Sequence, residues 1–156
     1  MAARPDRNPG LFKTQNNHAG DTHFVDYTLV RGTLQKGYEY YQALEHPFAK
    51  ALFMLFMTSE VHPFNDGNGR ISRIMMNAEL VAADQSKIII PTVFREDYLN
   101  ALRRLTRRGD PSVLIRAISR VREFSSHITG DNFEATRKYL ESCNAFKESD
   151  AYVLKF

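Results

Sequence analysis

One stretch of the sequence combines side chains that could carry chemistry: residues 62–73 read His-Pro-Phe-Asn-Asp-Gly-Asn-Gly-Arg-Ile-Ser-Arg. Pro63 cannot extend a preceding helix and moves His62 out of the α region, so a helix is expected to end at His62. An imidazole with an ordinary pKa of ~6.5 can accept a proton at neutral pH. Because His62 would stand at the end of a rigid element, it is the candidate general base.

The glycines of the same stretch predict a site for an anion. Gly67 and Gly69 occupy alternate positions and permit positive φ, which leaves the backbone N–H groups of the turn uncovered. Successive N–H groups in such a turn form a concave anion site. The turn leads directly into an expected helix, whose N-terminal N–H groups and dipole also favour anions.

The charges around this turn indicate what the anion would be. Arg70 and Arg73 fall in the first turn of the expected helix, where the dipole disfavours each cation by about 0.3 kcal/mol or more. Their spacing of three puts them on one face, so a polyphosphate would compensate both. Asp66 would repel that phosphate unless it carries a divalent metal, most simply Mg²⁺.

A purely structural interpretation of these residues is also open. In it the stretch is a glycine-rich turn between two helices, Asp66 or Asn68 caps the second helix, and His62 is a satisfied polar residue. Both arginines would then be solvated. The functional interpretation is preferred because it explains all of these residues together.

The stretch from His62 to Arg70 resembles the signature His-Pro-Phe-x-Asp/Glu-Gly-Asn-Gly-Arg of the Fic family (Fic/Doc, or Fido, domains), at all eight defined positions. Arg73 supplies the second arginine that many members carry. Further along, Arg95-Glu-Asp-Tyr-Leu-Asn-Ala-Leu102 is similar to an Arg-x-x-Tyr-x-x-Ala-Leu segment common in these domains. The resemblance extends from about residue 11 to about residue 125.

The resemblance implies an adenylyltransferase that moves AMP from ATP to a Ser, Thr or Tyr hydroxyl of a target protein and releases pyrophosphate. It implies that His62 is the general base and that Phe64 anchors the motif. It also implies an adenine-pocket role for Tyr98, although a core tyrosine is the preferred interpretation of that residue. The remaining implied site residues are Asp66 for Mg²⁺ and Gly67, Asn68 (through its backbone and its amide), Gly69, Arg70 and Arg73 for the phosphates.

The resemblance also implies partners. An N-terminal hairpin, at about residues 11–27, would be a flap that pairs with an extended segment of the target protein. Many members carry an inhibitory helix with the pattern Ser/Thr-x-x-x-Glu-Gly/Asn, but here the segments 92–97 and 119–124 end in neither Gly nor Asn. The inhibitor is therefore a separate antitoxin-like chain, part of a longer protein, or absent.

Two alternatives to AMP transfer remain open. One is a Fic-type transferase that uses another nucleotide, phosphocholine or a phosphate donor; Gly69 argues against phosphate transfer, because such motifs usually carry lysine there. The other is a non-catalytic nucleotide- or nucleic-acid-binding module. Residues 103–122 hold seven arginines against one acid, Asp110, but no nucleic-acid motif accompanies them, and nucleic-acid binding is not expected.

The patterning predicts an all-α domain: a compact helical bundle with a small β-hairpin near the N-terminus. The hairpin is expected to pair Leu11–Asn16 with Phe24–Val30 across a turn at 17–21. We expect one domain over residues 1–156, with residues 1–10 as an irregular tail. Helices are predicted at 33–45, 47–61, 69–84, 95–107, 111–127 and 132–146, with an extended segment at 87–91.

Composition excludes several other classes. The 156 residues are 43% hydrophobic and 25% charged with a net charge of +3, as in a soluble globular domain. Cys143 is the one cysteine, so an internal disulfide is excluded. The longest apolar run, Ala51–Met57, is far short of a bilayer span, and the first ten residues lack a signal-peptide core. We therefore expect no membrane partner and a cytoplasmic location.

Overall fold

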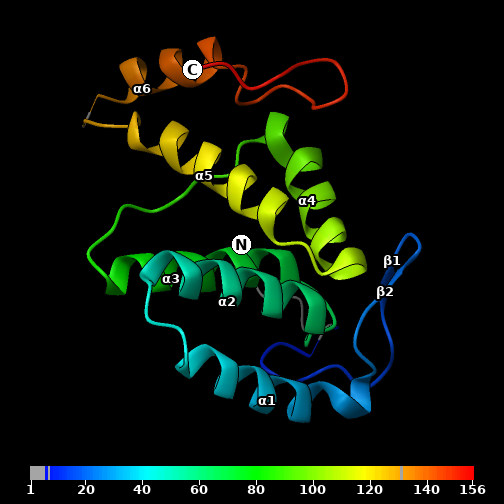
Figure 1. Cartoon of the computed structure of the whole chain (residues 1–156). Coiled ribbons are helices and arrows are strands. Elements are labelled where there is room, and N and C mark those ends of the chain that lie inside the picture. The colour runs from blue at the N-terminus through cyan, green and yellow to red at the C-terminus, as the bar shows by residue number, and fades with distance from the viewer. Residues whose placement is uncertain (1–5, 7, 131) are drawn as a thin grey trace. The chain divides into compact units, whose positions relative to one another are not determined.

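The computed structural model describes residue 6, residues 8–130 and residues 132–156, and it consists of helices with one small hairpin (Figure 1). It divides into two compact units, the first ending at Gln85 and the second starting at Ser86. The elements in chain order are β1 (His18–Ala19), β2 (Thr22–His23), η2 (Tyr27–Leu29), α1 (Val30–Gln42), α2 (Pro47–Val61), α3 (Asn68–Ala82), η3 (Thr92–Phe94), α4 (Arg95–Arg108), α5 (Ser112–Ser126) and α6 (Phe133–Ser142).

Helix α2 forms the centre of the first unit. It begins with Pro47 in its first turn, where a missing N–H costs nothing, and the Nδ1 atom of His46 accepts the N–H of Phe48. Its side chains are apolar on nearly every side because α1 and α3 both pack against it (Figure 1). Leu55 is completely buried, and Gly37 of α1 lies so close to Met57 that a Cβ there would meet its sulfur. This packing holds the C-terminal end of α2 rigidly.

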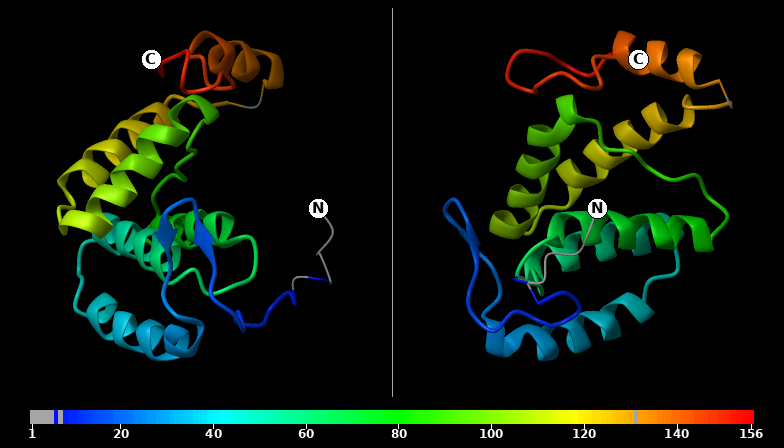
Figure 2. Two further views of the ribbon diagram at one scale, coloured as in Figure 1. Left: turned by 90° about the vertical axis from the view of Figure 1, so that its right-hand side faces the viewer. Right: turned by 180° about the vertical axis from the view of Figure 1, so that it is seen from behind.

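The hairpin is shorter than expected and lies elsewhere in the sequence. His18 pairs with His23 and Ala19 with Thr22, and the two short strands stand out from the helices of the first unit (Figure 2). The prediction that Phe24–Val30 is a strand is wrong. Asp26 accepts hydrogen bonds from both the backbone N–H and the hydroxyl of Thr28, so the chain enters a 3₁₀ turn at Tyr27 and α1 at Val30.

The second unit is built on α4 and α5. Gly109 ends α4 in the left-handed conformation, with φ of 65°, and Asp110 accepts the N–H of Ser112 at 3.0 Å. Helix α5 therefore begins at Ser112, one residue later than expected. Phe124 is completely buried, and the hydroxyl of Ser125 accepts the N–H of Ile89, which fixes the extended segment before η3.

Most helix predictions for the second unit are confirmed, but its last helix is shorter than predicted. Helix α6 ends at Ser142 rather than near Phe146, because Asn144 adopts a φ of 62° that a helix cannot continue. Among the described residues, no helix is both long and apolar enough to span a bilayer. The expectation of one domain over residues 1–156 stays a prediction.

Candidate active site

His62 ends α2 in a strained backbone conformation. Its φ of 48° and ψ of 57° lie in the left-handed region, and its N–H donates to the carbonyl of Thr58 at 3.2 Å. For a residue with a Cβ this conformation costs about 1–2 kcal/mol, so the surrounding contacts must hold it. The predicted helix end at His62 is confirmed, and the following Pro63 explains it.

Two contacts orient the imidazole of His62. Its Nδ1 atom lies 3.0 Å from the carbonyl oxygen of Ser59, and a carbonyl can only accept, so Nδ1 carries the hydrogen. One face of the ring stacks on Phe24, with centroids 3.6 Å apart and planes within 8°. Together these contacts leave the Nε2 atom with a lone pair that can accept a proton.

The electrostatic surroundings keep this imidazole neutral. Burial lowers the pKa of His62, the hydrogen bond to Ser59 raises it, and the positive charge of Lys13 lowers it further. The net effect is a pKa below the ordinary value. At neutral pH, His62 is therefore in the protonation state that a general base requires.

The side chain of Asn68 closes the turn that follows His62. Its Oδ1 accepts the N–H of Phe64 at 2.9 Å, and its Nδ2 donates to the carbonyl of Phe64 at 2.7 Å. Asn68 is only 2% exposed. The amide that was predicted to bind phosphate thus binds the turn itself, and the group that Asn68 can present to an anion is its backbone N–H in the first turn of α3.

Gly67 turns the chain into α3 with a φ of 81°, a conformation that favours glycine. Its N–H donates to the Oδ1 of Asp66 at 2.7 Å. As the next two helical positions, Asn68 and Gly69 have N–H groups for which a helix supplies no acceptor. Of the anion site predicted at Gly67, Asn68 and Gly69, these two N–H groups could act as backbone donors, since the N–H of Gly67 binds Asp66.

The two arginines reach back over this turn. A Cβ on Gly67 would lie 3.5 Å from Nη2 of Arg70, and a Cβ on Gly69 would lie 3.7 Å from Nη1 of Arg73. Long helical side chains point toward the helix N-terminus, which explains this direction. An anion above the turn would therefore meet two guanidinium groups in addition to the backbone N–H groups.

Asp66 fits the role of a single protein ligand for Mg²⁺. It is exposed, and its Oδ2 atom lies 3.8 Å from Nη2 of Arg70. No cluster of three His, Cys, Asp or Glu side chains occurs in the part of the chain that the structure describes. Mg²⁺ commonly binds one or two carboxylates together with substrate phosphates and water, so Asp66 could hold it only with a nucleotide present.

Comparison with known proteins assigns the chain to a family. The sequence model of the Fic/DOC family matches residues 1–80, which include the hairpin, His62 and the turn. The chain belongs to the Fic/DOC family. The protein adenylyltransferase Fic of Drosophila persimilis is 38% identical over 74 residues, 47% of this chain and 14% of that protein. The protein of the same name from Drosophila willistoni is 38% identical over 79 residues, 51% of this chain and 16% of that protein.

Solved structures of Fic proteins share the fold. Fic-1 (aa134–508) from C. elegans superposes with a TM-score of 0.65 at 20% identity, over 90% of this chain and 39% of that one. A Fic domain containing signaling protein from Bacteroides thetaiotaomicron gives 0.54 at 19% identity, over 94% of this chain and 57% of that one. This Fic chain spans only about a seventh of the Drosophila persimilis protein.

The structure also describes the two remaining predicted residues of the Fic chain, Phe64 and Tyr98. Phe64 is half-buried with its ring 5.9 Å from that of Phe12, so it ties the turn to the N-terminal segment. Tyr98 lies in α4 of the second unit and is only 3% exposed. A ring so buried has almost no surface for a ligand, which agrees with the core interpretation.

The sequence analysis missed four residues that contact the motif. Phe24 covers the imidazole, Ser59 orients it, and Lys13 and Asn17 bind the backbone around it. The sequence does distinguish Lys13, because it is the one lysine or arginine between residues 8 and 30. The other three have no local pattern that marks them.

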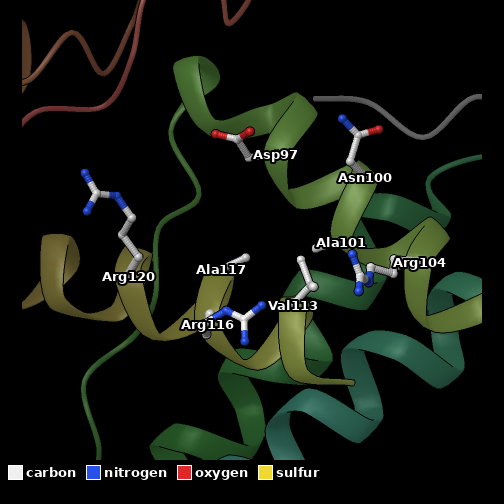
Figure 3. Close-up of a pocket in the computed structure, with 8 residues that line it drawn as sticks. All are labelled: Asp97, Asn100, Ala101, Arg104, Val113, Arg116, Ala117 and Arg120. Carbon is white, nitrogen blue, oxygen red and sulfur yellow. The ribbon is translucent and has the colours of Figure 1, made fainter. Parts of the chain in front are cut away.

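The arginine-rich helices of the second unit form a pocket of about 410 Å³ between α4 and α5 (Figure 3). Arg104, Arg116 and Arg120 line it. Arg104 pairs with Asp110 at 3.2 Å, and Arg120 donates to the carbonyl of Leu154 at 3.0 Å. The lining residues include no aromatic ring on which a base could stack, so the pocket does not favour a nucleic-acid site.

Proposed function

We propose that this chain transfers AMP from ATP to a Ser, Thr or Tyr hydroxyl of a target protein and releases pyrophosphate. The single observation that carries the proposal is the orientation of His62, whose Nδ1–H is held by Ser59 beside the anion-binding turn. The names of the Drosophila relatives, protein adenylyltransferase Fic, support the same reaction.

In the proposed reaction the target hydroxyl oxygen attacks the α-phosphorus of ATP. A phosphorus–oxygen bond forms there, the bond to the bridging oxygen of the β-phosphate breaks, and pyrophosphate leaves. The Nε2 atom of His62 accepts the hydroxyl proton, because Nδ1 already carries the hydrogen that binds Ser59. The lowered pKa of His62 keeps this nitrogen unprotonated at neutral pH.

The remaining site residues would bind and orient the phosphates. The N–H groups of Asn68 and Gly69 at the start of α3 would donate to the phosphates, and Arg70 and Arg73 would add two positive charges. Mg²⁺, held by Asp66 and the phosphates, would supply further neutralisation of charge. Transfer to phosphorus depends mainly on positioning and charge stabilisation, and these residues supply both.

The hairpin of β1 and β2 would receive the target. Its strands are short and mostly exposed, so an extended segment of another protein can pair with their backbone. Such pairing depends little on the target's sequence, because it uses main-chain hydrogen bonds. It would bring a hydroxyl toward His62, because Phe24, the residue after β2, already touches the imidazole.

The direct test is incubation of the chain with cell lysate, Mg²⁺ and ATP labelled at the α-phosphate. We expect labelled protein with the wild type and none with His62→Ala, while His127→Ala, a change at an exposed histidine of the second unit, should behave like the wild type. Absence of label from every protein in the wild-type sample would refute AMP transfer. In a parallel incubation with ATP labelled at the γ-phosphate, labelled protein in that sample alone would identify a phosphotransferase instead.

A further inference from the structure

Two residues of the N-terminal segment bind every backbone carbonyl from residue 61 to residue 64. Lys13 donates from Nζ to the carbonyl of Val61 at 3.3 Å and from its backbone N–H to that of Pro63 at 2.8 Å. Asn17 donates from Nδ2 to the carbonyls of His62 at 3.4 Å and Phe64 at 3.2 Å. Lys13 and Asn17 therefore hold the backbone on both sides of the imidazole.

The two residues also hold each other. Nζ of Lys13 donates to Oδ1 of Asn17 at 2.7 Å, which leaves the amide nitrogen of Asn17 directed at the motif. Lys13 is only 3% exposed, and burial lowers its pKa while the charge of Asp26 raises it. A buried lysine needs such partners, since unpaired burial of a charge is costly. Its position also suits a cation, because it lies at the C-terminal end of α2.

We propose that Lys13 and Asn17 are positioning residues for His62. Their hydrogen bonds stabilise the left-handed backbone of His62, and that backbone directs the ring to Ser59 and Phe24. The effect of this positioning on AMP transfer rests on the proposed function, whereas the orientation of His62 itself does not. Without these bonds, the strained backbone of His62 would be free to relax, and the imidazole would lose its single orientation.

Asn17 links the same backbone to the hairpin. Its carbonyl accepts the N–H of Phe24 at 3.4 Å, which closes the base of the hairpin directly before β1 and after β2. One residue therefore binds both the backbone of the general base and the base of the flap. As a result, Asn17 would position both a target docked on the flap and the imidazole that deprotonates it.

The test begins with the imidazole itself and needs no turnover. We would record nitrogen-15 spectra of the His62 ring across a pH titration for the wild type, Lys13→Met and Asn17→Ala. The matched controls are Lys36→Met and Gln15→Ala, which change exposed side chains outside these contacts. The wild type and both controls should show one Nδ1–H tautomer and a lowered pKa. In Lys13→Met and Asn17→Ala we expect a mixture of tautomers. The pKa of His62 should also shift upward in Asn17→Ala, which removes no charge, whereas an upward shift in Lys13→Met also follows from the lost charge of Lys13.

Enzyme kinetics then test whether the positioning of His62 affects the rate of AMP transfer. We expect AMP transfer at saturating ATP to fall about 10- to 100-fold in both variants, because misplacement of a catalytic group by about 1 Å can cost that much. Affinity for ATP should change less than about twofold, since the hydrogen bonds that Lys13 and Asn17 make to the motif end on the backbone of residues 61–64. A merely structural role would lower both quantities together with the folded fraction.

Wild-type tautomer and pKa in folded Lys13→Met and Asn17→Ala would overturn the proposal. If Lys13→Met fails to fold, Asn17→Ala decides, because Asn17 is only half-buried. If the wild type transfers no AMP, the proposed function fails. The spectra still decide whether Lys13 and Asn17 position His62.

Discussion

Replacement of Asn68 by alanine separates two roles that its side chain could play. The amide binds both backbone groups of Phe64, at 2.9 and 2.7 Å, in a site where Asn68 is 2% exposed. Asn68→Ala removes two hydrogen bonds. Loss of the bond to the carbonyl of Phe64 costs about 1 kcal/mol net, and loss of the other leaves the N–H of Phe64 without the acceptor that Asn68 supplies, at about 1–3 kcal/mol. The carbonyl of Phe64 keeps its bond from Asn17. We therefore expect a loss of about 2–4 kcal/mol.

Thermal melting of the full chain measures this loss. At about 2–4 °C per kcal/mol for a chain of this size, the Tm of Asn68→Ala should fall by about 4–16 °C. Asn100→Ala, at an exposed position in α4, is the control and should melt within about 2 °C of the wild type. An unchanged Tm together with weaker ATP binding would refute the structural role and favour the amide as a phosphate donor.

Three further predictions concern the same site. The rate of AMP transfer should be flat near pH 7 and fall as the pH drops through the lowered pKa of His62, and a pH–rate profile with no acidic limb would contradict the base role. Because the unfolded state binds that proton at higher pH than the folded state does, the free energy of unfolding should also fall below about pH 6.5. Gly67→Ala, at a φ of 81°, should cost about 1–2 kcal/mol in urea unfolding and weaken ATP binding, whereas Gly32→Ala in α1, with open space around it, should not destabilise the chain. Asp66→Ala should weaken ATP binding in Mg²⁺ but not in EDTA, measured by calorimetry; equal affinity of the variant and the wild type in Mg²⁺ would rule out the metal role.

Several features could be predicted from the sequence because they depend on neighbours within a few residues. Pro63 ends α2 at His62, and the apolar residues of α2 and α3 predict two packed helices. The glycines predict positive φ, which is found at Gly67, whereas Gly69 is helical. The family assignment likewise follows from a run of nine residues.

Other features depend on contacts between distant residues and could not be predicted. The strand expected at Phe24–Val30 looked β-forming, but the side chain of Asp26 captures the backbone of Thr28 and starts a helical turn instead. The two bonds from Asn17 to the motif join residues 45 and 47 positions apart. No local pattern encodes such a pairing, because it forms only when the N-terminal segment packs against the end of α2.

The sequence by itself therefore determined which residues could do the chemistry, because their types and their order in one turn are local properties. Only the tertiary structure decided how His62 is aimed, which of its nitrogens carries the hydrogen and which side chains hold its backbone. The physical reason is that a single strained residue has no stable orientation of its own. Ser59 at the end of α2 supplies part of that orientation. Phe24, Lys13 and Asn17 supply the rest from the N-terminal segment, which meets the end of α2 only in the folded chain.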